Sequence, residues 1–210
     1  MTRTILSFLS AVAVLILLSA PLSAKKNKKP KQKEPEQVQE KTQPEDDAPK
    51  VNPKQLEPKF LLKKKKRKDV AGDFDDKMEL LYYFPKVYNR SKIDVEDYKL
   101  TVHIIGQSVV ERTIFSILEV AEYKFNVASR KTFEPEERVL PNKYDDENSY
   151  RTGFKYYTYI ISVKDRSGKV ILIKCGKTKF NKNLESIIKF GKKQPFDDKG
   201  RQLKFKINAY

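Results

Sequence analysis

The sequence predicts an α+β domain: one mostly antiparallel sheet of five or six strands, with one or two helices on one face. Three observations indicate this class. Residues 154–175 form two β-rich runs around a polar loop with a glycine, which is typical of a hairpin. Residues 98–105 alternate apolar and polar side chains, and residues 109–123 carry an apolar stripe with helical spacing. A twisted β-sandwich is the alternative if residues 109–123 are extended.

Charge divides the chain of 210 residues, whose net charge is +16. Residues 25–68 carry a net charge of +9, residues 69–150 carry −6, and residues 151–210 carry +12. Residues 25–72 are rich in lysine, proline and glutamate, and their few apolar side chains cannot offset the entropy of ordering. We therefore expect a disordered basic arm over residues 25–72, followed by one small domain over residues 73–210.

Residues 1–24 have the plan of a signal peptide. Arg3 precedes an apolar run over residues 5–18, and small residues near position 24 suit cleavage. The run is shorter than the ~20 residues that a spanning helix needs. The lysines that directly follow residue 24 oppose translocation, so an uncleaved membrane anchor is the alternative. A secreted or periplasmic protein is the expectation.

The domain begins with two predicted strands. Residues 78–84 are apolar and aromatic and stop at Pro85, as a strand does. In the strand over residues 98–105, alternation places His103 on the polar face, where we expect an exposed or edge position.

The next two segments are predicted as a helix and a loop. Ser108 starts a capping-box pattern, and the stripe over residues 109–123 favours a helix, although many of its residues are β-branched. Residues 130–150 are acidic, polar and contain proline, which is typical of a solvated loop.

The hairpin and the C-terminal elements complete the sheet. Residues 156–163 carry large apolar side chains on both faces, which indicates a central strand. Asn181 or Asn183 then suits the start of a short helix that ends near Gly191. Residues 202–210 alternate as a last strand.

No catalytic apparatus is evident, and no cofactor or metal site is expected. Cys175 is the single cysteine and His103 the single histidine, so an intrachain disulfide is impossible and a zinc site has no support. A hydrolase that uses acidic residues such as Glu136 and Asp146 is one alternative.

The charge pattern instead predicts a non-catalytic binding protein with an anionic partner: a membrane surface, an envelope polymer or an acidic protein. A secreted nucleic-acid binder that uses Tyr150, Tyr156, Tyr157 and Tyr159 is the other alternative. The sequence does not indicate the oligomeric state. The residues predicted to bind the polyanion are Lys63, Lys64, Lys65, Lys66, Arg67, Lys68, Lys174, Lys177 and Lys179.

Overall fold

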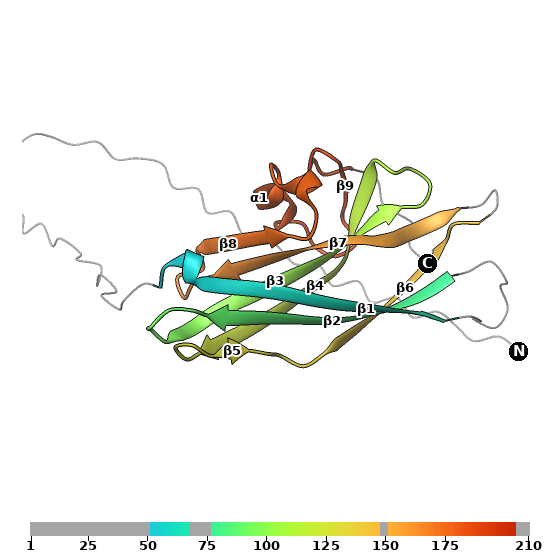
Figure 1. Ribbon diagram of the computed structural model, residues 1–210. Helices are drawn as coiled ribbons and strands as arrows, with labels where there is room; N and C mark the ends of the chain where they lie inside the picture. Colours follow the sequence, from blue (N-terminus) through green and yellow to red (C-terminus); the bar gives the residue numbers. More distant parts are fainter. Residues whose placement is uncertain (1–50, 68–76, 148–150, 205–210) are drawn as a thin grey trace, which may run out of the picture. The chain divides into compact units, whose positions relative to one another are not determined.

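The computed structural model describes residues 51–67, 77–147 and 151–204 (Figure 1). The predicted signal peptide and the part of the predicted arm over residues 25–50 lie outside these ranges. Within them, the chain is nearly all-β, with one short α-helix. The predicted α+β class is therefore wrong. None of the described helices is long and apolar enough to cross a membrane.

One antiparallel sheet of nine strands forms the framework, in the order β1-β2-β6-β7-β3-β4-β9. β5 pairs with β2, and β8 pairs with β7. In chain order the elements are the 3-10 helix η1 (Pro53–Gln55), β1 (Leu56–Arg67), β2 (Lys77–Asn89), β3 (Val95–Ser108), β4 (Ile114–Val127), β5 (Thr132–Phe133), β6 (Arg138–Asp145), β7 (Thr152–Lys164), β8 (Val170–Cys175), the 3-10 helix η2 (Thr178–Phe180), α1 (Leu184–Ile187) and β9 (Pro195–Asp197).

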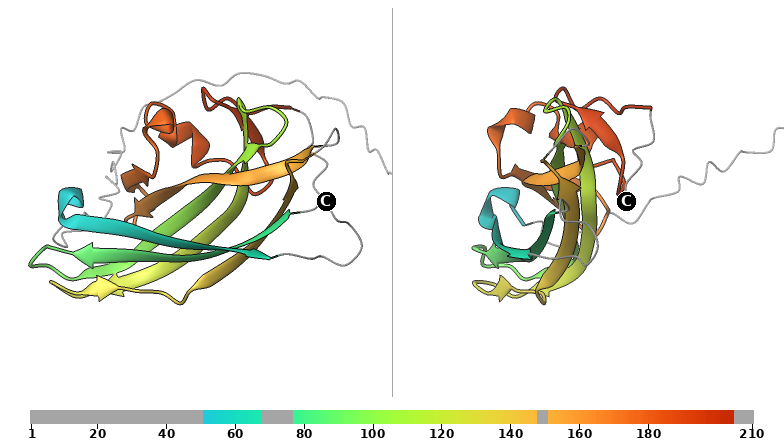
Figure 2. Two further views of the ribbon diagram at one scale, coloured as in Figure 1. Left: turned by 45° about the vertical axis from the view of Figure 1, so that its right-hand side comes forward. Right: turned by 90° about the vertical axis from the view of Figure 1, so that its right-hand side faces the viewer.

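The sheet curls over on itself, as the end-on view in the right panel of Figure 2 shows. The larger core cluster lies inside this curl and joins Leu56 of β1 and Leu81 of β2 to Val102 of β3, Ala121 of β4 and Ile161 of β7. The free edge of β1 comes close to β7 and β8. The Phe60 and Tyr159 rings stack with centroids 4.1 Å apart, and Lys174 Nζ donates to the Pro58 carbonyl at 3.1 Å.

The C-terminal segment covers the other face of β3, β4 and β7. Phe180, Ile187 and Phe196 are completely buried there against Ile105 and Phe115. These contacts also bury His103, which is only 2% exposed. The prediction of an exposed or edge His103 is wrong because both faces of β3 are covered, and alternation within one strand does not show this.

The stretch predicted as a helix, residues 109–123, is a turn followed by most of β4. The capping signal at Ser108 is real: its Oγ accepts from the backbone N–H groups of Val110 and Glu111 at 3.2 and 3.1 Å, but it closes a turn. The strand then contains a bulge, because Ile104 pairs with Glu119 while Ile105 pairs with Ile117. A bulge inserts one residue and breaks the period of two, which made this strand resemble a helix.

Two further predictions are corrected by strand pairing. β6 lies within residues 130–150, which were predicted as a loop, and it pairs with β2 from Lys77↔Tyr144 to Tyr83↔Arg138. β1 lies within the predicted disordered arm and pairs with β2 over its whole length. Both strands are rich in polar residues. β1 is ordered by pairing with the next strand in the chain, and β6 by pairing with the sequence-distant β2. Residues 68–72 of the arm are not described.

The predicted hairpin is confirmed as β7 and β8, which pair antiparallel. Its loop is closed by a hydrogen bond from the Gly168 N–H to the Asp165 carbonyl at 2.9 Å. The predicted strands over residues 98–105 and 78–84 lie within β3 and β2, but β2 continues through Pro85. Pro85 is tolerated because it lies between the residues of β2 that pair with β6 and those that pair with β5.

The structure describes only part of the predicted C-terminal elements. Asn183 is the N-cap of α1, one of the two expected positions, but α1 ends at Ile187 and not near Gly191. Gln202 forms an isolated bridge with Phe196, and residues 205–210 of the predicted last strand lie outside the described ranges.

The corner between β6 and β7 depends on Gly153, and we expect Gly153→Ala to be costly. Gly153 has φ +88°, and an added Cβ would lie 3.0 Å from Tyr144 Cα and 3.1 Å from the Lys143 carbonyl oxygen. Gly168 is the matched control, because it has φ +81° but nothing within 4 Å of an added Cβ. Urea denaturation should show that Gly153→Ala loses about 1–3 kcal/mol more than Gly168→Ala, since only Gly153 adds a clash to the backbone strain. Equal losses would contradict the close contact at this corner.

Candidate functional site

β1 divides the predicted basic run between two sides of the sheet. Successive side chains of a strand point to opposite faces, so Lys63, Lys65 and Arg67 share one face and Lys64 and Lys66 share the other. The partners on β2 identify these faces. Lys63, Lys65 and Arg67 pair with half-buried Tyr82, Leu80 and Met78, whereas Lys64 and Lys66 pair with buried Leu81 and Glu79.

Three cations therefore lie on the outside of the curl, next to an apolar surface. We call this surface the outer face; it consists of Leu61, Lys63, Lys65 and Arg67 of β1, Met78, Leu80, Tyr82 and Phe84 of β2, and Val139, Pro141 and Lys143 of β6. The pairing aligns these residues in cross-strand rows such as Lys63–Tyr82–Val139 and Lys65–Leu80–Pro141. Leu61 and Val139 are 54% and 49% exposed. The outer face is thus apolar along β2, carries three cations on β1 and one, Lys143, on β6, and its residues include no Asp or Glu.

The two inward cations of β1 form a different environment. Lys64 Nζ lies 4.4 Å from the centre of the Tyr156 ring. Burial lowers the pKa of Lys64, nearby Glu79 opposes this shift, and the charges of Lys155 and Lys177 add to it. Lys64 and Lys66 therefore lie beside the buried carboxylate of Glu79.

Glu79 is only 3% exposed, and its Oε1 accepts a hydrogen bond from the Tyr144 hydroxyl at 2.9 Å. Burial and this bond raise the pKa of Tyr144. The inner side of β1 is therefore a partly enclosed polar site, unlike the outer face.

The predicted cations of the C-terminal region do not join the outer face. Lys174 holds β8 to β1 through the Pro58 carbonyl. Lys177 Nζ lies 3.7 Å from the centre of the Tyr157 ring. Lys179 Nζ lies 4.8 Å from the centre of the Phe115 ring and 3.9 Å from Asp198 Oδ2. All three make contacts within the domain. Lys68 lies outside the described residues.

The tyrosines that the nucleic-acid alternative needs are engaged inside the protein. Tyr159 stacks on Phe60, and Tyr157 packs on Phe115 with ring centres 5.1 Å apart. Burial raises the pKa of Tyr156 to about 12, and Lys64 Nζ lies over its ring. Tyr150 is not described. A row of open rings for stacking bases is therefore not formed by Tyr156, Tyr157 and Tyr159.

The groups considered for chemistry are also separated or paired. Asp146 is bound by Lys77 and Lys155, and Glu134 lies 2.9 Å from Lys86. Burial raises the pKa of Cys175, which favours the unreactive thiol. In the part of the chain that the structure describes, no group of three or more His, Cys, Asp or Glu residues is placed to hold a metal ion.

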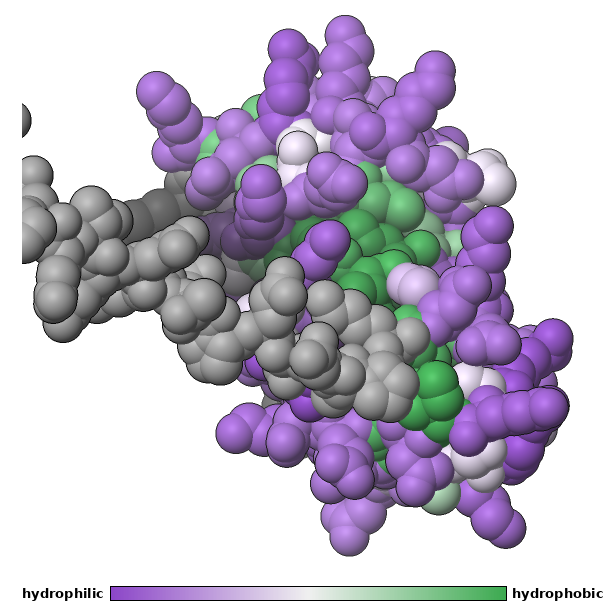
Figure 3. Space-filling model, turned by 90° about the vertical axis from the view of Figure 1, so that its left-hand side faces the viewer, coloured by the Kyte–Doolittle hydropathy of each residue, from purple (hydrophilic) through white to green (hydrophobic). Residues whose placement is uncertain are grey.

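A second surface feature lies at the end where β8 begins. Figure 3 looks onto this end and shows an apolar area surrounded by hydrophilic residues. A hollow of about 530 Å³ lies there between β8 and α1, lined by Val170, Ile171, Leu172, Ile173, Glu185, Ile188 and Lys189. It has one acidic and one basic residue, so its charge does not indicate a partner.

Sequence reasoning missed most of the outer face. It found the cations of β1 but placed β6 in a loop, so the contribution of Val139, Pro141 and Lys143 was not seen. The apolar residues at positions 78, 80, 82 and 84 were a signal, because a strand with apolar residues on both sides presents a second apolar face.

No protein-family model matches the chain, and no curated protein matches it. Among solved structures, it is similar to Bacteroides uniformis β-glucuronidase 2, with a covalently bound cyclophellitol-6-carboxylate aziridine, at 8% identity over 55% of this chain and a TM-score of 0.36. The match spans only 12% of that enzyme's chain.

Two other solved structures are similar at the same level. A Northeast Structural Genomics Consortium target is 13% identical over 60% of this chain and 88% of its own, with a TM-score of 0.32. A structure from Akkermansia muciniphila is 14% identical over 61% of this chain and 74% of its own, with a TM-score of 0.30. Similarities this low carry no argument about fold or function.

Proposed function

We propose that the protein is an exported, non-catalytic binding protein that docks its outer face on an anionic membrane surface. The cross-strand rows of the outer face are the observation that supports this proposal. Half-exposed Leu61 lies beside the cations of β1, half-exposed Val139 shares β6 with Lys143, and the apolar residues of β2 lie between the two strands. Apolar side chains suit the acyl boundary of a bilayer, and lysines near an anionic leaflet contribute ~1 kcal/mol each.

Other anionic partners fit the outer face less well. A polysaccharide or an acidic protein would use the cations but would leave the apolar centre without a matching partner. A nucleic acid would require open aromatic faces, and the tyrosines near the basic C-terminal region pack within the domain. The membrane surface is the partner that uses both parts of the outer face.

Replacing two outward cations is expected to weaken membrane binding. The double variant Lys63→Gln and Lys65→Gln should bind vesicles of phosphatidylglycerol and phosphatidylcholine about thirtyfold more weakly, because two lysines contribute roughly 2 kcal/mol. Binding should also weaken as salt is raised, because salt screens exposed charges. Vesicle co-sedimentation at two salt concentrations measures both effects.

The matched control is the double variant Lys124→Gln and Lys131→Gln. Both of these lysines are exposed and lie away from the outer face, on β4 and next to β5. Every variant keeps residues 1–50, so the contribution of that basic stretch is the same in each. Equal weakening by both double variants, or binding that does not respond to salt, would contradict the proposal.

The Leu61→Ser variant distinguishes binding to a membrane from binding to an anionic polymer. It removes an exposed apolar side chain and no charge, so it should weaken binding to vesicles and leave binding to heparin unchanged. Tight heparin binding with no loss on vesicles would assign the outer face to a polymer instead of a membrane.

A further inference from the structure

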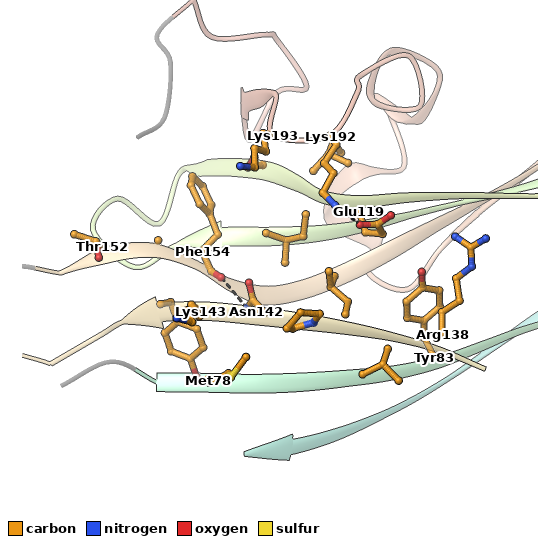
Figure 4. A pocket seen from close by; sticks show the side chains of 18 of the residues that line it. Met78, Tyr83, Glu119, Arg138, Asn142, Lys143, Thr152, Phe154, Lys192 and Lys193 are labelled. Carbon is orange, nitrogen blue, oxygen red and sulfur yellow. Dashed lines mark hydrogen bonds and ion pairs between the residues drawn. The ribbon is translucent and has the colours of Figure 1, made fainter. Parts of the chain in front are cut away.

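A cavity of about 780 Å³ opens on the flank of the curled sheet, between β4 and β6 (Figure 4). β6 pairs with β2 and with the start of β7, while β4 pairs with β3 and β9. Among the described strands no ladder joins β4 to β6, so the space between them is bounded by side chains. Small-molecule sites occupy roughly 300–1,000 Å³, and this cavity is of that size.

The wall of the cavity is mainly apolar. Met78, Leu118, Leu140 and Phe154 line it, and they come from β2, β4, β6 and β7. The amide of Asn142 is occupied, because its Nδ2 donates to the Phe154 carbonyl at 2.9 Å (Figure 4). This apolar wall, to which four strands contribute side chains, suits the hydrocarbon part of a ligand.

One part of the lining is polar and carries an unmatched positive charge. Glu119 is neutralised by Lys192, whose Nζ lies 2.6 Å from Glu119 Oε2 (Figure 4). Arg138 lies with its guanidinium carbon 4.8 Å from the centre of the Tyr123 ring and has no carboxylate partner among the described residues. Lys193 also lines the cavity. Lys143 and Glu137 line it too, so three cations face one carboxylate once Glu119 and Lys192 are paired, and the net charge available to a ligand is positive.

Two tyrosine hydroxyls lie beside Arg138, and the Arg138 side chain hydrogen-bonds Tyr83. Burial raises the pKa of Tyr83 to about 12, and the charge of Arg138 opposes this shift, so the phenol is protonated at neutral pH. The Tyr123 hydroxyl is buried with no well-formed hydrogen bond to a described residue, although Tyr83 lies beside it. A guanidinium offers a planar fork of donors that matches a carboxylate.

We propose that this cavity binds an amphipathic monoanion, with its hydrocarbon chain against the apolar wall and its carboxylate on Arg138. The apolar wall and a guanidinium without a carboxylate partner among the described residues together define this class. A cation is disfavoured because Glu119 is paired with Lys192, and Arg138, Lys143 and Lys193 outnumber the other lining carboxylate, Glu137. The cavity and the outer face share Met78, Val139, Pro141 and Lys143. Arg138 and Tyr83 point to the opposite side of their strands from the outer face, so the inference does not rest on the proposed docking.

Fluorescence titration of the full chain with cis-parinarate and with its neutral methyl ester tests the proposal. Both probes should bind saturably at one site. Arg138→Gln should weaken cis-parinarate at least about tenfold, because a hydrogen bond to a charged group is lost, and should change the methyl ester less than about twofold. Leu140→Trp, which places a larger side chain in the cavity, should weaken both probes.

Matched controls lie outside the cavity. Arg112→Gln removes an exposed arginine, and Leu61→Trp adds the same ring to the outer face; neither should alter the binding of either probe. Vesicle binding should be unchanged by Arg138→Gln, so failure here is distinct from failure of the proposed function. Non-saturable binding, or equal affinity of cis-parinarate for Arg138→Gln and the unmodified chain, would overturn the proposal.

Discussion

Phe180→Ala is expected to lower the free energy of unfolding by about 3–5 kcal/mol, the usual cost of removing a buried aromatic ring. Phe180 is completely buried on the face of the sheet that the C-terminal segment covers. Its ring lies edge-on to Phe115 with centres 5.0 Å apart and 5.8 Å from the Phe196 ring. The variant would leave a cavity between the sheet and the C-terminal segment, which are joined by this aromatic cluster.

Urea denaturation of the Phe180→Ala variant measures this loss. Leu61→Ala serves as the control, because Leu61 is 54% exposed and should change stability by only about 0.5 kcal/mol. A loss below about 1 kcal/mol for Phe180→Ala would mean that the C-terminal segment is not part of the cooperative unit.

The second large effect is acid destabilisation through His103. Burial lowers the pKa of His103 to about 4, and its Nδ1 is buried without a hydrogen-bond partner among the described residues. A hydrogen bond with the Ile188 backbone and the charge of Glu122 oppose the shift, and the charge of Lys164 adds to it. In the unfolded chain the imidazole has its ordinary pKa of about 6.5, so it gains a proton there before it does so in the folded state. Acid therefore favours unfolding.

The expected loss of stability from His103 is about 3 kcal/mol as the pH falls from about 6.5 to about 4, with no further contribution below that. Denaturation of the His103→Gln variant at several pH values should lack this component. His103 is the only histidine, so the difference between the two curves above pH ~5 belongs to this residue. Parallel curves would show that His103 is accessible to protons in the folded protein.

Several local features could be read from the sequence because they depend on neighbouring residues. Gly168 closes the hairpin loop, Asn183 occupies the N-cap position of α1 without a side-chain hydrogen bond, and Ser108 accepts two backbone hydrogen bonds. The Ser108 signal identified the turn correctly but not the element after it. A side-chain cap satisfies backbone donors in a helix or a turn alike, so pairing with β3 decided that β4 is a strand.

The candidate site was predictable only in part, for the same reason. Residues 63–67 were identified from their charge, but their division between the outer face and the inner side depends on pairing with β2. Lys174 was assigned to the site by charge alone, whereas its contact with the Pro58 carbonyl joins residues 116 positions apart. The role proposed for Arg138 was not predicted, because β6 has the composition of a loop.

The sequence by itself determined the charge of each region, the turns, and the alternation within β3 and β7, because these depend on residue type and short spacing. Only the tertiary structure decided which faces are covered. β3 is buried on both sides because β1 and β2 fold over one face and the C-terminal segment over the other. Burial arises from contacts between distant segments, so the buried position of His103, the apolar outer face and the cavity beside Arg138 emerge only when the sheet has curled.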